Sequence, residues 1–280
     1  MAPTILGAVL LAAFLHAVWN AMIKVSGDRL VIMAVTAFAT SLLALPFVLL
    51  LPAPARESWP LLVLSLCIHT TYMLMLVRAY GHGEFVQIYP LARGSAPLLT
   101  AFLGFLLLGE SLTAREIAGV GLIIASILGF AAERVGGIRQ LSQAALAYSL
   151  LTGLCITAYS LVDGQGARLA ANSHSYTAWM FLLHGTLFPL IAVFRRRGRF
   201  MATAGAVWKP GIAVALISAL AYWIVIWAFS QERIAPVAVL RETSVAFAAL
   251  ISAFLIKEKF SAQRAVLILL IIAGIVLLAG

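Results

Sequence analysis

Long apolar runs recur from one end of this chain to the other, and only short polar segments separate them. A run of roughly 20 apolar residues has the length that an α-helix needs to cross the hydrocarbon core of a bilayer. The segments between the runs are too short to hold a soluble domain. The pattern therefore predicts ten transmembrane helices, at residues 3–24, 30–52, 59–80, 86–109, 115–132, 143–168, 175–195, 206–231, 237–256 and 262–279.

The composition of the chain agrees with this pattern. Hydrophobic residues make up 63% of the 280 residues and charged residues 10%, and the mean hydropathy is +1.06. A water-soluble domain cannot bury that much apolar surface, so we expect an all-α integral membrane protein. The first run has no Lys or Arg before it, and no convincing cleavage site follows it. We therefore interpret it as a retained helix and not as a signal peptide.

Lysine and arginine residues are distributed unevenly between the two sides of the predicted membrane. The formal net charge of +9 does not indicate nucleic-acid binding, because most basic residues lie in short loops. The odd-numbered loops and their flanks hold thirteen of them: Lys24, Arg29, Arg78, Arg134, Arg139, Arg195, Arg196, Arg197, Arg199, Lys209, Lys257, Lys259 and Arg264. The other side holds Arg56, Arg115, Arg168 and Arg233. The positive-inside rule places the odd loops in the cytoplasm and both termini outside, in the periplasm for a bacterial-type inner membrane. The arginine run at 195–199 is interpreted as a topology anchor, with binding of anionic membrane lipids as a secondary interpretation.

The second half of the chain can be laid over the first. Without a gap, Arg93 pairs with Arg241 and Glu110 with Glu258, and the letters LIIA occur at both 122–125 and 270–273. Each half then holds five predicted helices, one half at residues 1–139 and the other at 140–280. Because five is odd, the two halves are expected to be inverted repeats, an architecture that suits transport by alternating access.

The pattern that ends each half also resembles a known family. An arginine is followed by about sixteen apolar or small residues, then by GES or KEK, then by a short final helix. This is similar to the drug/metabolite transporter superfamily, EamA type. The resemblance implies a central cavity lined by helices 1 to 4 and 6 to 9, with helices 5 and 10 at the periphery. A stripe of small residues, Gly121, Ala125 and Gly129, is expected to pack helix 5 closely against a neighbour.

Polar side chains inside the predicted helices indicate where a substrate would bind. Each such group is unfavourable in a bilayer by about 2.5–3.5 kcal/mol when it is charged, so it requires a reason. Helical spacing places several of them on common faces. The expected substrate-binding residues are His16, Trp19, Asn20, Tyr72, Tyr89, Arg93, Tyr159, Tyr222 and Arg241. The expected coupling or gating residues are Lys24, Asp163 and Glu242.

Simpler interpretations stay open for some of these residues. Lys24 and Asp163 lie near the ends of their helices, from which side chains can snorkel to the headgroups. His16 can form a hydrogen bond to a neighbouring helix without touching a substrate. The glycines of the DGQG stretch at 163–166 predict a frayed or kinked end of helix 6.

Arg93 is the strongest candidate, because it lies between Pro90 and Pro97 in an apolar run. Two prolines predict a kinked or irregular opening of this helix, and irregular backbone is tolerated at membrane depth only inside protein or beside a water-filled cavity. We therefore expect Arg93 to face the cavity and to bind a negatively charged group, such as a carboxylate, of a substrate. The simpler interpretation is that Arg93 snorkels from the start of its helix to the headgroups. Arg241 is followed directly by Glu242, which can neutralise it.

The sequence offers few signs of an enzyme. It has no HExxH zinc motif, and the GSA tripeptide at Gly94–Ala96 is too short to nominate a nucleophile. The two cysteines, Cys67 and Cys155, fall inside predicted helices and indicate neither a disulfide framework nor a metal site. We expect no cofactor.

The favoured function is that of a monomeric inner-membrane carrier for a small polar metabolite such as an amino acid, with export as the expected direction. A proton, bound at Asp163 or Glu242, is the expected coupling partner. A multidrug or organic-cation exporter is the main alternative. A channel or a lipid scramblase is a further one, which saturation and counterflow measurements would separate from a carrier.

Overall fold

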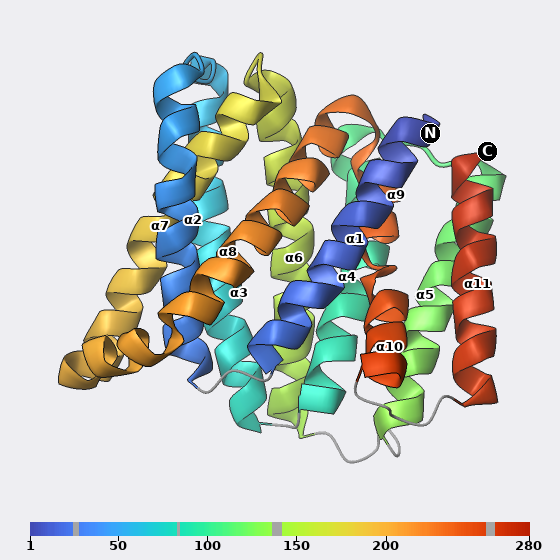
Figure 1. The fold of residues 1–280 in the computed structure, drawn as a ribbon. Helices are drawn as coiled ribbons and strands as arrows, with labels where there is room; N and C mark the ends of the chain where they lie inside the picture. Colours follow the sequence, from blue (N-terminus) through green and yellow to red (C-terminus); the bar gives the residue numbers. More distant parts are fainter. Residues whose placement is uncertain (25–27, 83–84, 136–141, 256–260) are drawn as a thin grey trace.

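The computed structural model describes residues 1–280 except 25–27, 83–84, 136–141 and 256–260 (Figure 1). The described residues form α-helices and two short 3₁₀ turns, with no strand among them. The helices are α1 (Pro3–Lys24), α2 (Arg29–Leu50), α3 (Trp59–His82), α4 (Phe85–Leu108), α5 (Ala114–Val135), α6 (Gln143–Leu169), α7 (Ser173–Arg196), α8 (Phe200–Gln231), α9 (Ile234–Arg241), α10 (Ser244–Leu255) and α11 (Ala262–Ala279). The 3₁₀ turns are η1 (Arg56–Ser58) and η3 (Arg197–Arg199).

The helices have the length and composition of membrane-spanning segments. Seven stretches of the described chain are long and apolar enough to cross a bilayer, and one of them, Ser173–Gln231, contains both α7 and α8. Successive helices run in alternating directions, apart from α9 and α10, which run the same way, and the two ends of the chain lie at the same end of the bundle (Figure 1). Large apolar side chains such as Leu50 and Phe194 are exposed on the outside. The fold is that of a multi-pass membrane protein.

Polar residues at the helix ends explain where several helices begin. Asp28 caps α2 by accepting hydrogen bonds from the backbone N–H groups of Leu30 and Val31. Ser142 and Asn172 cap α6 and α7 in the same way. Each cap satisfies backbone donors that the first helical turn leaves without partners, so these polar positions end the loops.

The position of the helix break differs from the sequence expectation. The opening of the fourth helix was expected to be irregular near Pro90 and Pro97, but α4 is helical without interruption from Phe85 to Leu108. The break lies instead in the second half, between α9 and α10. There the backbone N–H groups of Glu242, Thr243 and Val245 bond three residues back, which makes a tight turn directly after Arg241. Proline alone therefore did not locate the break.

The DGQG stretch is also regular, contrary to the expected frayed end. α6 continues through it to Leu169. A methyl group on Gly166 would lie 2.3 Å from the ring of Tyr176, and one on Gly164 would lie 2.4 Å from the side chain of Ile234. The two glycines therefore permit close packing of α7 and α9 on α6.

Each half of the chain packs extensively against the other half. α6 packs against α3 and α4, and α1 packs in turn against α8, α9 and α10. α2 packs against α7, and α5 packs against α11 at one side of the bundle (Figure 1). In α5 the contact face is not the expected stripe, because Gly121 and Ala125 are exposed. Gly119, Gly129 and the Ser126 hydroxyl, which donates to the Leu267 carbonyl, face α11 instead.

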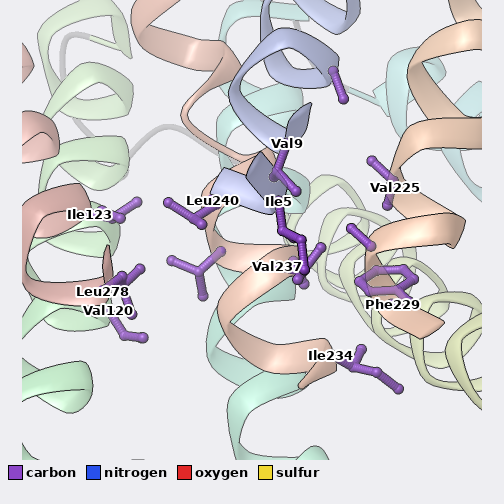
Figure 2. Close-up of a cluster of buried hydrophobic side chains, with 14 of the residues drawn as sticks. Ile5, Val9, Val120, Ile123, Val225, Phe229, Ile234, Val237, Leu240 and Leu278 are labelled. Atoms are coloured by element: carbon purple, nitrogen blue, oxygen red, sulfur yellow. The ribbon is translucent and has the colours of Figure 1, made fainter. Parts of the chain in front are cut away.

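The core of the bundle surrounds α9. All eight residues of this helix are buried. Ile234, Val237 and Leu240 pack with side chains from α1, α5, α8 and α11, as Figure 2 shows. The turn that follows α9 is thus held in a rigid apolar surrounding, which positions Arg241 and Glu242.

Candidate functional site: a polar cavity between the two halves

A cavity of about 210 Å³ lies inside the bundle. Its described lining comes from α1, α2, α3, α4, α6, α7, α8 and α9, and none of it comes from α5 or α11. The family resemblance implied this arrangement, and the structure confirms it. Most of the lining is apolar or aromatic, with two arginines and several histidines and tyrosines among it. Such a mixture suits a small molecule that has both polar and apolar parts.

Seven of the predicted substrate-binding residues line this cavity: His16, Trp19, Tyr72, Arg93, Tyr159, Tyr222 and Arg241. They come from six helices of both halves, so the tertiary structure brings together residues far apart in sequence. Asn20 does not line it, because its side-chain N–H donates to the carbonyl of His16, one turn earlier, at 2.7 Å. The side chains of Tyr89 and Lys24 lie outside the described part of the chain, so their predicted roles stay predictions.

Arg93, Arg241 and Glu242 form a buried cluster at the cavity wall. Arg93 Nε and Glu242 Oε2 lie 2.7 Å apart, an ion pair without the alignment of a hydrogen bond. Arg241 Nη2 lies 3.3 Å from Oε1 of the same carboxylate. Glu242 was expected to neutralise Arg241, but it lies between both arginines. Two guanidinium groups therefore share one carboxylate, and the cluster carries a net positive charge.

The break after α9 makes this geometry possible. Glu242 follows the last residue of α9, and Arg93 comes from α4, which packs against α9. All three side chains are at most 5% exposed. An arginine stays protonated even in such a place, so its charge is permanent.

Asp163 is the second buried carboxylate, and its partners are different. Its side chain is fully buried, so the interpretation that it snorkels to the headgroups is wrong. Its Oδ2 accepts a hydrogen bond from the Tyr222 hydroxyl at 2.6 Å and lies 3.1 Å from Nε2 of His69. Its Oδ1 accepts from the Tyr176 hydroxyl at 3.2 Å. We call Asp163, His69, Tyr176 and Tyr222 the Asp163 cluster.

Aromatic contacts connect the two clusters. The ring of Tyr159 stacks on His69 with centroids 4.1 Å apart, and it also faces the guanidinium of Arg241 at 5.8 Å. Trp19 contacts the ring of His16 edge to face on α1. Aromatic rings thus form much of the cavity wall, and the charged groups of the two clusters lie next to these rings.

Several residues of the lining are not among the expected substrate-binding residues, although His69 and His184 are polar residues within predicted helices. His69 and His184 line the cavity, with ring centroids 4.4 Å apart. α2 contributes four residues at helical spacing, Met33, Thr36, Ala37 and Thr40. The two threonines are polar positions in an otherwise apolar helix and could have indicated a cavity face. Helical spacing alone, however, does not distinguish a face toward the cavity from a face toward the lipid. Phe181 carries no polar atom, so nothing in its sequence context marks it.

A network of charged groups joins helix ends at the end of the bundle where the chain termini lie (Figure 1). Glu110 accepts hydrogen bonds from the backbone N–H groups of Ile234 and Ala235 at the start of α9. Arg168, at the end of α6, lies 3.0 Å from Glu110 Oε1 and donates to the carbonyls of Phe229 and Glu232. The network joins the α4–α5 turn to the ends of α6, α8 and α9.

The described residues hold no group of three or more His, Cys, Asp or Glu side chains that could bind a metal ion. The arrangement provides instead two fixed cations, a partly exposed histidine beside a buried carboxylate, and aromatic walls. These groups can bind and orient a small solute.

Comparison with known proteins agrees with this geometry. One solved structure, titled only "Crystal structure of protein", aligns over 98% of this chain and 94% of its own, with a TM-score of 0.71 and 17% sequence identity, so the two share a fold. No curated protein sequence matches the chain. A family model described as the EamA-like transporter family matches residues 3–132 and 143–280. The chain therefore belongs to the EamA-like transporter family and is a multi-pass membrane protein of a transporter type.

Proposed function

We propose that this protein is a secondary transporter that exports a small polar metabolite bearing a carboxylate, such as an amino acid, by alternating access. The observation that carries the proposal is the charge of the cavity wall. Arg93 and Arg241 are the charged residues of the described lining, and no carboxylate belongs to it. Glu242 and Asp163 lie behind the wall. A substrate with a carboxylate would therefore meet positive charge, and a guanidinium has enough donors to bind it while keeping Glu242.

The packing of the helices supports ten membrane spans arranged as two inverted repeats. We match the helices of the two repeats as follows: α1, α2 and α3 correspond to α6, α7 and α8, α4 corresponds to α9 plus α10, and α5 corresponds to α11. Most helix–helix contacts then have a counterpart between the matching helices. The contact of α3 with α6 corresponds to that of α8 with α1, and the contact of α2 with α8 to that of α7 with α3. Such an exchange is expected for repeats related by a two-fold axis in the membrane plane.

The closed end of the cavity supports alternating access. We infer that the Glu110 and Arg168 network, which joins the helix ends near the termini, closes the cavity there, whereas lining residues such as Ile23, Met33 and Met73 lie toward the other end. By the positive-inside rule, the end with thirteen basic residues is cytoplasmic, so this conformation would face inward. We therefore propose an inner-membrane location with both termini in the periplasm.

The aromatic lining favours one second candidate, an exporter of organic cations. Trp19, Tyr72, Tyr159, Tyr222 and Phe181 offer ring faces that attract a cation. The carboxylate proposal and this one predict opposite effects of removing positive charge from the wall.

The first experiment tests Arg93 in purified protein. We expect a thermal-shift screen of metabolites to find carboxylate ligands, because a ligand that binds the native state raises its stability. Reconstituted Arg93→Ala protein should lose nearly all transport of such a ligand, and Arg93→Lys, which keeps the charge but not the planar fork, should transport more weakly than wild type.

The control is Arg196→Lys, on the exposed pair of Arg196 with Asp28, which should behave as wild type. An amide or ester of the ligand should be a poor substrate of the wild-type protein. Equal transport of the uncharged analogue, or normal transport by correctly inserted Arg93→Ala, would contradict the carboxylate proposal. Faster transport of cations by Arg93→Ala would favour the second candidate.

The proposed topology has its own test in intact cells. In a background without Cys67 and Cys155, we expect a cysteine at Thr113 to react with an impermeant thiol reagent added outside. A cysteine at Gly198, in η3, should react only after the membrane is opened. The reverse pattern of labelling would show the opposite orientation.

A further inference from the structure

The Asp163 cluster contains a carboxylate that contacts no permanent cation among the described residues. Asp163 is fully buried in α6, and the described groups that contact its carboxylate are the hydroxyls of Ser65, Tyr176 and Tyr222 and the imidazole of His69. Hydroxyls donate hydrogen bonds but bring no charge. An ionised carboxylate alone in a medium of low dielectric is strongly unfavourable. The pair of His69 and Asp163 is electrically neutral only when it holds one proton, on the imidazole or on the carboxyl.

Water in the cavity can reach this proton. The side chain of His69 is 17% exposed and belongs to the cavity lining, whereas Asp163 lies behind it. The Nε2 atom of His69 must carry a hydrogen in order to donate to the carboxylate, 3.1 Å away. His69 therefore connects the buried carboxylate with the solvent of the cavity, and a proton can enter or leave by way of its ring.

The groups that face the pair from neighbouring helices limit it to one proton. α7 contributes His184, whose ring lies 4.4 Å from that of His69, and a second positive imidazole there would be repelled. The remaining titratable or charged groups around the pair are Tyr72 on α3, Tyr159 on α6, Tyr176 on α7, Tyr222 on α8, Arg93 on α4 and Arg241 on α9. Tyrosines stay neutral near pH 7, and the arginines stay charged.

The His69–Asp163 pair lies at the contact of α6 with α8, and we expect this contact to be closed in one access state and open in the other. Tyr222 joins α8 to Asp163 on α6, and these two helices pack together at the closed end of the cavity. By the correspondence of the two repeats, α6 and α8 match α1 and α3. The described residues of α1 and α3 make no contact of comparable extent, and both helices contribute to the cavity lining. An exchange of conformation between the halves would therefore break the contact of α6 with α8.

We propose that the His69–Asp163 pair is the proton-binding site of this transporter, and that its proton holds the α6–α8 contact closed. Loss of the proton leaves a bare carboxylate at that contact, which draws in water and opens it. The closed state is therefore favoured at low pH and is lost as the pH rises, and the proton is exchanged for substrate in each cycle. This inference rests on the proposed transport function but does not depend on which substrate is carried.

The experiment uses spin labels and no substrate. Cysteines at Leu169 on α6 and Gln231 on α8, both exposed, carry the labels in a background without Cys67 and Cys155, and electron paramagnetic resonance measures their separation in lipid nanodiscs. We expect the short distance to dominate at mildly acidic pH and a longer one to grow as the pH rises. Because one proton is bound, the ratio of the two populations should change by at most about tenfold per pH unit.

Asp163→Asn, whose amide has no titratable proton and stays neutral, should keep the short distance at every pH. His69→Gln should move the transition to lower pH, because the carboxyl then holds the proton by itself. Two matched controls should keep the wild-type response. They are Asp28→Asn, at the partly buried N-cap of α2, and His82→Gln, on the same helix as His69 but outside the described cavity lining.

Three results would overturn the proposal: no pH dependence in the wild type, a wild-type response in Asp163→Asn, or a dependence steeper than one proton allows. Each can occur while Arg93-dependent transport persists, in which case the proton site fails and the transport function stands. Conversely, a pH-dependent distance in a protein that transports no carboxylate would keep the proton site and remove the proposed substrate class.

Discussion

Glu242 and Asp163 are two carboxylates buried in the same helical bundle, and they differ in what balances them. Glu242 lies between two guanidinium groups, whereas Asp163 meets three hydroxyls, of Ser65, Tyr176 and Tyr222, and an imidazole. Arginine keeps its proton at any physiological pH, but histidine and aspartate exchange theirs. The first cluster therefore holds a fixed positive charge suited to binding an anion. The second can change its charge. Burial alone does not tell these two roles apart, but the identity of the partners does.

The largest effect is expected from removing the fixed carboxylate. Glu242→Ala would leave Arg93 and Arg241 buried side by side without their shared partner, and breaking a buried pair in this way destabilises a protein by about 3–5 kcal/mol. We expect a clear loss of thermal stability in detergent. Arg196→Ala breaks an exposed pair and should lower stability by at most about 1 kcal/mol. Equal effects of the two substitutions would mean that the arginine cluster is not a buried unit.

A smaller and more specific effect is expected on the pH dependence of transport, which should differ between substitutions of the two carboxylates. Asp163→Asn should flatten the pH dependence of substrate efflux from proteoliposomes, because the proton site is gone. Glu242→Gln should lower the efflux rate but keep the wild-type pH profile, because its arginine partners do not titrate. The measurement is the initial efflux rate across the neutral pH range. Unchanged profiles in both variants would rule out proton coupling through either group.

The smallest effect concerns a single hydroxyl of the Asp163 cluster. Tyr222→Phe removes the 2.6 Å hydrogen bond from Asp163 but keeps the ring that lines the cavity. Loss of one such bond typically destabilises by about 0.5–1.5 kcal/mol, toward the upper end when the partner is charged. We expect a small fall in stability and a shift of the α6–α8 distance toward the open value. Tyr148→Phe, outside the described cavity lining, should cause neither change.

The broad architecture was predictable because it depends on local properties of the chain. Runs of apolar residues dictate helices that cross a bilayer, and the described helices α1 to α8 and α11 overlap nine of the predicted spans. The resemblance over both halves also identified the EamA-like family, which the family model confirms. Arg93, Tyr159 and Arg241 were recognisable as cavity residues because a charged or polar side chain in a membrane helix needs a protein surrounding.

Tertiary structure decided which partner each polar group meets, because partners come from helices that are distant in sequence. Nothing near Asp163 in the chain indicates that His69, 94 residues away, is its neighbour, or that α6 continues through two glycines to bury it. In the same way, Asn20 has the helical spacing of a cavity residue, yet its amide is used by the preceding turn. The break after Arg241 occurs where α9 is enclosed by other helices, and the two prolines of α4 produce none. Hydropathy and spacing depend only on neighbours along the chain, whereas the charge balance of a buried group depends on every helix that surrounds it.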